Sequence, residues 1–410
     1  MRCVAHVHWQ GQFLTGDRVR GYCVVLLVFE LACFAFLVAG THGWIVPLDQ
    51  PNSSDFVSFY AAGSLADDGT AALAYDKAAH YAREQQATEP GIGYNFFFYP
   101  PIFLLLCAAL ARLPYLAAFI LFQAGCLLPC LILVRRIVGP VAWSTLLAFP
   151  AVFWAIGTGQ NALLTAALLA GATLLMERSP LRAGLLLGAL CYKPHLAMLV
   201  PVALLAGGHW RAMAGAALSV VGLAGLSLAM FGWGTWRAFA TVAVNAGSVY
   251  ASPATSIDLA GLTSPYGFVM ASGGDRASAM ALQAAVVLGA ALAVAECWRR
   301  PTRLALRAAV LLAALPLVSP VAMFYDLMVT GVALAWLVRD GREHGFPPWQ
   351  PSLVALAFLL PLLSGNTGFD SQIGIPPLAA ALGFGLALRQ AFRGQALVRP
   401  AGLEPATKPL

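Results

Sequence analysis

The chain has 410 residues, of which 60% are hydrophobic and only 10% are charged, and its mean hydropathy is +0.76. A soluble protein of this length needs far more polar surface, so the composition excludes a soluble globular protein and predicts a polytopic membrane protein. The formal net charge is +6, but the Lys and Arg residues form small groups between apolar segments. Such groups indicate which loops lie in the cytoplasm, and we expect no nucleic-acid partner.

The apolar runs last about 15 to 25 residues and lack the alternation of lipid-facing strands, so they predict transmembrane helices and not a barrel. The eight cysteines lie mostly inside these runs, and no pair of CxxC motifs exists. We therefore expect neither disulfides nor a metal site.

The first expected span covers residues 21–40 and follows Arg18 and Arg20. It is too long for a cleaved signal peptide and reads as a retained signal anchor with residues 1–20 in the cytoplasm. The positive-inside rule then places residues 42–99, which include Asp55, in a large extracytoplasmic loop.

The next apolar segments cover residues 100–113, 115–134 and 141–156. At about 1.5 Å per residue the first of them covers about 20 Å, which is less than the roughly 30 Å hydrocarbon core. We favour a re-entrant or interfacial segment there, which puts Arg135 and Arg136 in the cytoplasm and residues 157–161 outside. If this segment does cross, these assignments invert.

Residues 183–206 are interrupted near Lys193, which predicts either a shallow hairpin with Lys193 at its outer apex or one kinked helix. A span at 212–231 leads to a second extracytoplasmic loop, residues 232–278, which is rich in Gly, Ser, Thr and Tyr. The remaining apolar segments cover residues 279–298, 304–318, 319–338, 353–363 and 375–388.

The predicted fold is thus an all-α polytopic transmembrane bundle of about 10–12 membrane segments. A single domain covers residues 21–393, and a disordered cytoplasmic tail covers 394–410. The polar groups that are not topology markers all fall on the extracytoplasmic face, which suggests one shared cavity. No internal repeat is evident, and this weakens a secondary-transporter interpretation.

Asp55 is the sharpest catalytic candidate. A carboxylate at the membrane boundary, ahead of a short amphipathic segment, can be partly desolvated and act as a general base. The alternative is that Asp55 only caps the helix that follows it.

A charged lysine at bilayer depth is energetically unfavourable, so a buried Lys193 implies a partner or a cavity. Lys193 could bind a phosphate together with His195, or its side chain could extend to the lipid headgroups. Gln160 and Asn161 could bind sugar hydroxyls, although Asn161 could equally cap the next helix.

Tyr325 and Asp326 lie inside an apolar run, where an aspartate is a functional candidate by default. We expect them to bind the sugar or the acceptor, and pairing of Asp326 with a lysine or arginine is the alternative. Glu30 in the first span has the same status with weaker support. The aromatic segment of residues 96–101, with Tyr99 and Pro100, is suited to an apolar groove for a lipid.

The sequence resembles the polytopic glycosyltransferases of family 87, of GT-C type, over roughly residues 20–340. The motifs that carry this resemblance, in order, are DFVSFYAA from Asp55, FYPPI around Tyr99 and Pro100, GQN ending at Asn161, AG leading to Lys193-Pro194, and SP at 319–320 with YDL from Tyr325.

The resemblance implies a GT-C fold and transfer of a hexose, commonly mannose, from a polyprenyl-phosphate donor to a lipid or glycan acceptor. It further implies an active site on the extracytoplasmic face of a bacterial inner membrane, with Asp55 as the catalytic base. The first loop has Asp-Phe-Val and no DxD pair, so we expect no metal or other cofactor.

This chemistry needs a base, cations or dipoles for the departing phosphate, and an apolar groove for the lipid. Asp55, Lys193 with His195, and residues 96–101 match these needs. A single base without a covalent nucleophile suggests direct displacement with inversion. Two alternatives remain at this point: a transporter or lipid flippase that uses Glu30 and Asp326, and an inactive GT-C relative that serves as a scaffold.

Overall fold

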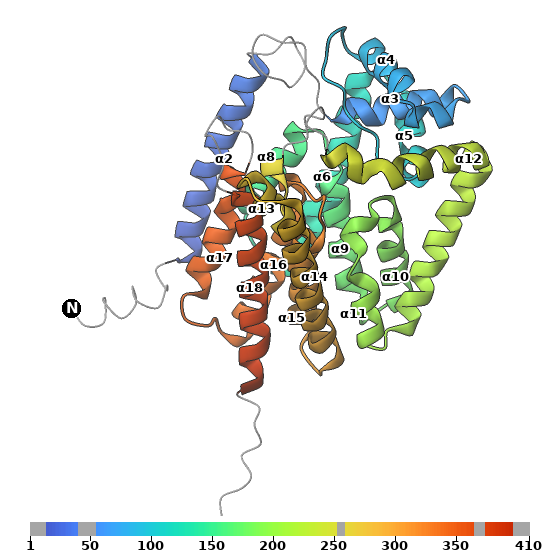
Figure 1. Cartoon of the computed structure of the whole chain (residues 1–410). Helices are drawn as coiled ribbons and strands as arrows, with labels where there is room; N and C mark the ends of the chain where they lie inside the picture. The colour runs from blue at the N-terminus through green and yellow to red at the C-terminus, as the bar shows by residue number, and fades with distance from the viewer. Residues whose placement is uncertain (1–13, 40–54, 252–258, 365–373, 397–410) are drawn as a thin grey trace, which may run out of the picture.

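The computed structural model describes residues 14–39, 55–251, 259–364 and 374–396 (Figure 1). These residues form helices and turns, and within them the only β pairing is an isolated bridge between Leu262 and Met323. The predicted all-α class is confirmed. The predictions for residues 1–13 and for most of the tail lie outside the described residues.

The α-helices, in chain order, are α2 (Gly16–Ala39), α3 (Phe56–Asp67), α4 (Lys77–Ala87), α5 (Pro101–Ala111), α6 (Tyr115–Val138), α7 (Trp143–Leu147), α8 (Pro150–Gly157), α9 (Ala162–Leu175), α10 (Pro180–Ala189), α11 (Val200–Ala206), α12 (Trp210–Ala251), α13 (Pro265–Ala271), α14 (Arg276–Arg299), α15 (Leu304–Val318), α16 (Met328–His344), α17 (Gln350–Leu359) and α18 (Ile375–Ala396). Short 3-10 helices connect them at η1 (Ala71–Tyr75), η2 (Leu190–Tyr192), η3 (Pro194–Ala197), η4 (Leu259–Gly261), η5 (Phe324–Leu327) and η6 (Leu360–Leu363).

Four of the described helices, α6, α12, α14 and α18, are long and apolar enough to cross a membrane. Six shorter apolar helical segments accompany them, because proline and glycine interrupt the runs. The protein is therefore an integral membrane protein, and the number of 10–12 membrane segments stays a prediction.

Helix α5 is too short to cross a bilayer, since its 11 residues extend only about 16 Å. The first turn of α5 and the turn that follows the helix both contact α3. The Phe103 ring lies 5.1 Å from that of Phe59, and the hydroxyl of Tyr60 donates to the carbonyl oxygen of Leu113 at 2.9 Å. Gly63 lets the two helices touch, because a Cβ there would meet the carbonyl oxygen of Cys107. This geometry matches the interfacial alternative for residues 100–113.

The chain reverses at Lys193, so the hairpin alternative for residues 183–206 is the one observed. Helix α10 packs closely on the beginning of α12, where a Cβ on Gly184 would meet the carbonyl oxygen of Ala212 and one on Gly215 would meet that of Leu181. Such small residues let helix backbones approach within a membrane. Lys193 lies at the tip of the hairpin, away from both of these contacts.

Helix α12 does not end where the sequence suggested. Gly232 has φ 73° and ψ 168°, a conformation that strongly favours glycine, and the chain continues as a helix to Ala251. Figure 1 shows this second part running across the molecule below α3 and α4. There Phe239 packs against Tyr75 of η1 with ring centroids 5.8 Å apart. The expected loop at 232–278 is therefore helical over much of its described length.

Helices α15 and α16 form the centre of the bundle. Every residue of α15 from Ala308 to Val318 is buried, and α16 packs against α9, α6 and α18 as well as α15. These central helices support the loops at their ends that carry polar side chains.

Candidate active site

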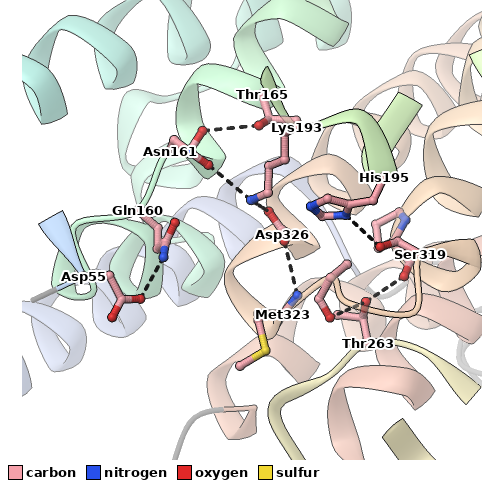
Figure 2. A network of polar contacts seen from close by, with 12 residues as sticks. Asp55, Gln160, Asn161, Thr165, Lys193, His195, Thr263, Ser319, Met323 and Asp326 are labelled. Atoms are coloured by element: carbon pink, nitrogen blue, oxygen red, sulfur yellow. Dashed lines mark hydrogen bonds and ion pairs between the residues drawn. The ribbon is translucent and has the colours of Figure 1, made fainter. Parts of the chain in front are cut away.

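Asp55 immediately precedes α3, but its side chain makes no cap hydrogen bond to the helix. Its backbone N–H donates to the carbonyl oxygen of Thr158 at 2.8 Å, and its Oδ2 accepts a hydrogen bond from Nε2 of Gln160 at 2.8 Å (Figure 2). The capping alternative is thus wrong. The carboxylate is held from the turn between α8 and α9, and its Oδ1 has no partner among the described residues.

The pKa of Asp55 lies above the ordinary range of an aspartate. Burial is the main cause, because it penalises the charged form, while the Gln160 hydrogen bond and the positive charge of Lys193 act in the opposite direction. A raised pKa makes the carboxylate a stronger proton acceptor, which suits a general base.

Gln160 connects Asp55 to the aromatic segment before α5. Its Oε1 accepts a hydrogen bond from the hydroxyl of Tyr99 at 3.2 Å, and the carbonyl oxygen of Tyr99 accepts one from Tyr75 at 2.9 Å. Pro100 is buried at the start of α5 with φ −58° and ψ 157°, so it fixes the direction of the chain after Tyr99.

Lys193 and Asp326 form a buried ion pair in which Nζ lies 2.6 Å from Oδ1, and their side chains are 3% and 1% exposed. Nζ also donates to Oδ1 of Asn161 at 3.2 Å, while Asp326 Oδ2 accepts from the backbone N–H of Met323 at 3.2 Å (Figure 2). Lys193 therefore does not snorkel, and its charge is already compensated. Asn161 does not cap α9 through its side chain.

Tyr325 and His195 flank this ion pair. The ring of Tyr325 lies 5.2 Å from Lys193 Nζ, a cation–π distance. His195 Nδ1 lies 2.7 Å from the hydroxyl of Ser319, which directly follows α15. Thr263 holds this end of α15 and the turn after it, because its hydroxyl donates to the carbonyl oxygen of Pro316 at 2.7 Å and its backbone N–H donates to that of Ala322 at 2.9 Å. Thr263 belongs to the second predicted loop, so that loop does reach the site.

All nine candidate site residues thus lie in one connected region. Asp55, Gln160, Tyr99 and Pro100 make up one part, and Lys193, Asn161, Asp326, Tyr325 and His195 make up the other. The two parts meet where Gln160 and Asn161 follow one another in the chain. Glu30 lies outside this network in α2, and neither of its carboxylate oxygens has a hydrogen-bond partner in the described part of the chain.

Two further buried residues lie on α4, close to the first turn of α3, and were not among the candidates expected from the sequence. His80 and Glu84 of α4 are fully buried; His80 Nε2 lies 3.1 Å from the carbonyl oxygen of Ser58, and Glu84 Oε2 accepts from the backbone N–H of Asn95 at 3.2 Å. Burial raises the pKa of Glu84 to about 8, and burial lowers the pKa of His80 to about 4. Both shifts favour the neutral forms of the two side chains. Their spacing of four residues on a helix was the signal available in the sequence.

Within the described ranges, no group of three or more His, Cys, Asp or Glu side chains could hold a metal ion. The seven described cysteines are free thiols.

The fold and this network define an integral membrane protein with a polar site at one end of a helical bundle. The family model of glycosyltransferase family 87 matches residues 97–320, which is more than half of the chain, and the chain belongs to this family. It is therefore a membrane glycosyltransferase. The matched range contains Tyr99, Gln160 and Lys193, whereas Asp55 and Asp326 lie on either side of it. Comparisons with curated proteins and with solved structures find no match.

Proposed function

We propose that this glycosyltransferase moves a hexose from a polyprenyl-phosphate donor to a hydroxyl group of a lipid or glycan acceptor, with Asp55 as the general base. The observation that carries the proposal is the state of the Asp55 carboxylate. It does not cap α3, one oxygen is held by Gln160, the other has no partner among the described residues, and burial raises its pKa.

In the proposed step, Asp55 takes the proton of the acceptor hydroxyl while the acceptor oxygen forms a bond to the anomeric carbon. The bond between that carbon and the phosphate oxygen breaks, and polyprenyl phosphate leaves with the electron pair. One base and one displacement imply inversion at the anomeric carbon.

The donor phosphate would bind beside Lys193 and His195. Because Asp326 already compensates Lys193, we propose that the lysine acts mainly by orienting Asn161 and by its field at Asp55. A Ser319 hydroxyl that donates to His195 Nδ1 leaves the Nε2–H of the neutral ring to donate to phosphate. Tyr99 and Pro100 would face the lipid end of the donor, and Gln160 and Tyr325 the sugar or the acceptor.

The finer assignments follow the family resemblance. We propose mannose as the sugar, a GT-C arrangement, and a location in a bacterial inner membrane with the site on the extracytoplasmic face. The Arg groups support this orientation, since Arg135, Arg136, Arg339 and Arg342 lie at the ends of α6 and α16 that are opposite to Asp55. We also propose that transfer needs no metal ion or cofactor.

The test is sugar transfer by the purified protein in lipid nanodiscs, with polyprenyl-phosphate-mannose and polyprenyl-phosphate-glucose offered to a panel of lipid and glycan acceptors. We expect Asp55→Asn to lower the rate at least 100-fold, within the roughly 10²–10⁴-fold range of general base catalysis. The rate should not change when a chelator is added.

Asp68→Asn is the matched control, because Asp68 lies in the same loop, is 56% exposed and only pairs with Arg83. It should keep the wild-type rate. Full activity of a folded Asp55→Asn protein would remove Asp55 as the base, and an absence of transfer with every donor would favour the scaffold alternative. Transfer from the glucose donor alone would correct the sugar.

A further inference from the structure

A large apolar cavity of about 1140 Å³ lies between α2 and the rest of the bundle. Its walls come from α2, α6, α16, α17 and the segment 140–149, and Figure 1 shows α2 at the edge of the molecule. The cavity exceeds the roughly 300–1,000 Å³ of a typical small-molecule pocket, and side chains such as Leu26, Val134, Val332 and Phe358 line it. An occupant must therefore be mostly hydrocarbon.

Among the described residues, the charged side chains that line this cavity are Arg20, Arg135 and Arg342. In the part of the chain that the structure describes, none of the three has a carboxylate within ion-pair distance, whereas seven other arginines do. Arg135 and Arg342 each donate to one backbone carbonyl, that of Val141 at 3.2 Å and that of Val138 at 2.9 Å. The Arg135 guanidinium also lies over the ring of Trp143, 4.6 Å from its centre, a contact that leaves its N–H groups free to donate in the plane of the guanidinium. A guanidinium has five N–H donors, so each retains several for an anion.

The three arginines lie at the end of the bundle that is opposite to Asp55. Arg20 is near the beginning of α2, and Arg135 and Arg342 are in the last turns of α6 and α16. The other end of α6 contacts α3 through Tyr115 and Phe56, whose rings are 5.5 Å apart. A donor phosphate at Asp55 could not also bind these arginines, because α6 is 24 residues or about 36 Å long.

We propose that this cavity is a binding site for an anionic phospholipid, whose acyl chains fill the space between α2 and the bundle and whose phosphate binds Arg20, Arg135 and Arg342. An apolar chamber with guanidinium groups at one end that have no carboxylate partner among the described residues complements such a lipid in both shape and charge. Free phosphate would leave the apolar walls empty. The site is independent of the sugar-transfer chemistry.

At this position the lipid would stabilise the packing of α2 on the bundle. Within the described residues, α2 packs mainly on α7 and α8, and several of its apolar side chains, among them Val25 and Leu31, are exposed. A lipid in the cavity supplies the contacts between α2 and helices α6, α16 and α17. The lipid thereby fixes the position of α2, the helix that precedes Asp55 in the chain.

The test compares Arg20→Gln/Arg135→Gln/Arg342→Gln with the matched control Arg136→Gln/Arg182→Gln/Arg211→Gln. The control removes the same charge from exposed arginines at the same end of the bundle that do not line the cavity. Delipidated protein is titrated with phosphatidylglycerol or phosphatidylcholine and followed by native mass spectrometry and thermal unfolding. We expect wild type and control to retain one phosphatidylglycerol at least 10-fold more tightly than phosphatidylcholine, and the cavity variant to lose this preference.

A second pair of variants, Ala355→Trp and Ala142→Trp, fills the cavity and leaves the arginines in place. Each should abolish retention of the lipid, and either one suffices if the other fails to fold. Three results would overturn the proposal: an equal loss of the preference in the control, unchanged retention in a folded tryptophan variant, or displacement of phosphatidylglycerol by equimolar polyprenyl phosphate, which would make the cavity part of the donor site.

Discussion

At the scale of single residues, the ion pair of Lys193 and Asp326 dominates the energetics of the site. Both side chains are almost fully buried, so each charge depends on the other for compensation. Removing one partner of a buried pair leaves an uncompensated charge, which is strongly destabilising.

We therefore expect Lys193→Met and Asp326→Asn each to destabilise the protein by about 3–5 kcal/mol, and the double variant to recover much of that loss. Thermal unfolding in nanodiscs measures both effects. The exposed pair of Arg339 and Glu343 is the control, since its removal should change stability by about 0–1 kcal/mol. Single variants at the buried pair that unfold like this control would show that the stability of the protein does not depend on this pair.

Glu84 gives a pH-dependent prediction. Its pKa is about 8 in the folded protein against an ordinary value of 4.5, so the folded state holds a proton that the unfolded state has released. This contribution to stability is complete below pH 4.5 and is lost as the pH rises towards 8. His80 acts in the opposite direction, because its pKa of about 4 removes stability as the pH falls below 6.5.

Glu84→Gln cannot ionise and can still accept from the N–H of Asn95. Its melting temperature should exceed that of wild type by an amount that grows between pH 5 and pH 8, equivalent to about 2–4 kcal/mol at the upper end. Glu89→Gln in the same loop is the control and should show no such trend. A constant difference across this range would mean that Glu84 is ionised throughout.

At the scale of helices, the contact between α3 and α5 positions Asp55. Gly63 and Cys107 touch at the crossing of the two helices, where any side chain would force them apart. Gly63→Ala should destabilise the protein by about 1–3 kcal/mol and lower sugar transfer at least 10-fold, because α3 carries Asp55.

Gly125→Ala in α6 is the matched control. A Cβ at this position meets nothing within 4 Å, and alanine favours the helix by up to about 1 kcal/mol. Transfer and melting temperature measured together would test the idea; a Gly63→Ala protein with wild-type activity would show that the position of Asp55 does not depend on this contact.

The sequence predicts the helices well wherever apolar runs have clear polar ends. The segment 304–318 coincides with α15, and the segment 100–113 contains the short helix α5. The helix after Gly232 was missed because a charge-poor sequence rich in Gly, Ser and Thr resembles a loop, and its packing on η1 is a tertiary contact that local pattern does not contain.

The site residues could be named from their types, since polar groups are rare in such an apolar chain. Their partners could not all be predicted. Pairing of Asp326 with a lysine was one open alternative, but only the fold selects Lys193. The burial of His80 and Glu84 could not be predicted either, because their loop is polar and its packing depends on α3 and on the aromatic segment before α5.

At the scale of the whole molecule, the orientation of the bundle determines where sugar transfer takes place. Ala82 and Arg136 are both exposed. Ala82 lies on α4, which packs on α3, whereas Arg136 lies in the last turn of α6, the helix whose first residue, Tyr115, contacts Phe56 of α3. With Asp55 outside, a membrane-impermeant maleimide added to intact cells should label Ala82→Cys and should label Arg136→Cys only after the cells are opened. Wild type gives the background of the native cysteines, and the reverse labelling pattern would invert the proposed topology.

The distance along the chain between Lys193 and Asp326 also governs the order in which the site is made. The two residues are 133 positions apart, so at about 5–20 residues per second the lysine is synthesised roughly 7–27 s before its partner. During that interval the tip of the α10–α11 hairpin carries a cation that would cost about 2.5–3.5 kcal/mol at the bilayer centre. A hairpin tip that stays near the membrane surface avoids this cost, and the buried pair of the site is complete only when η5 reaches Lys193.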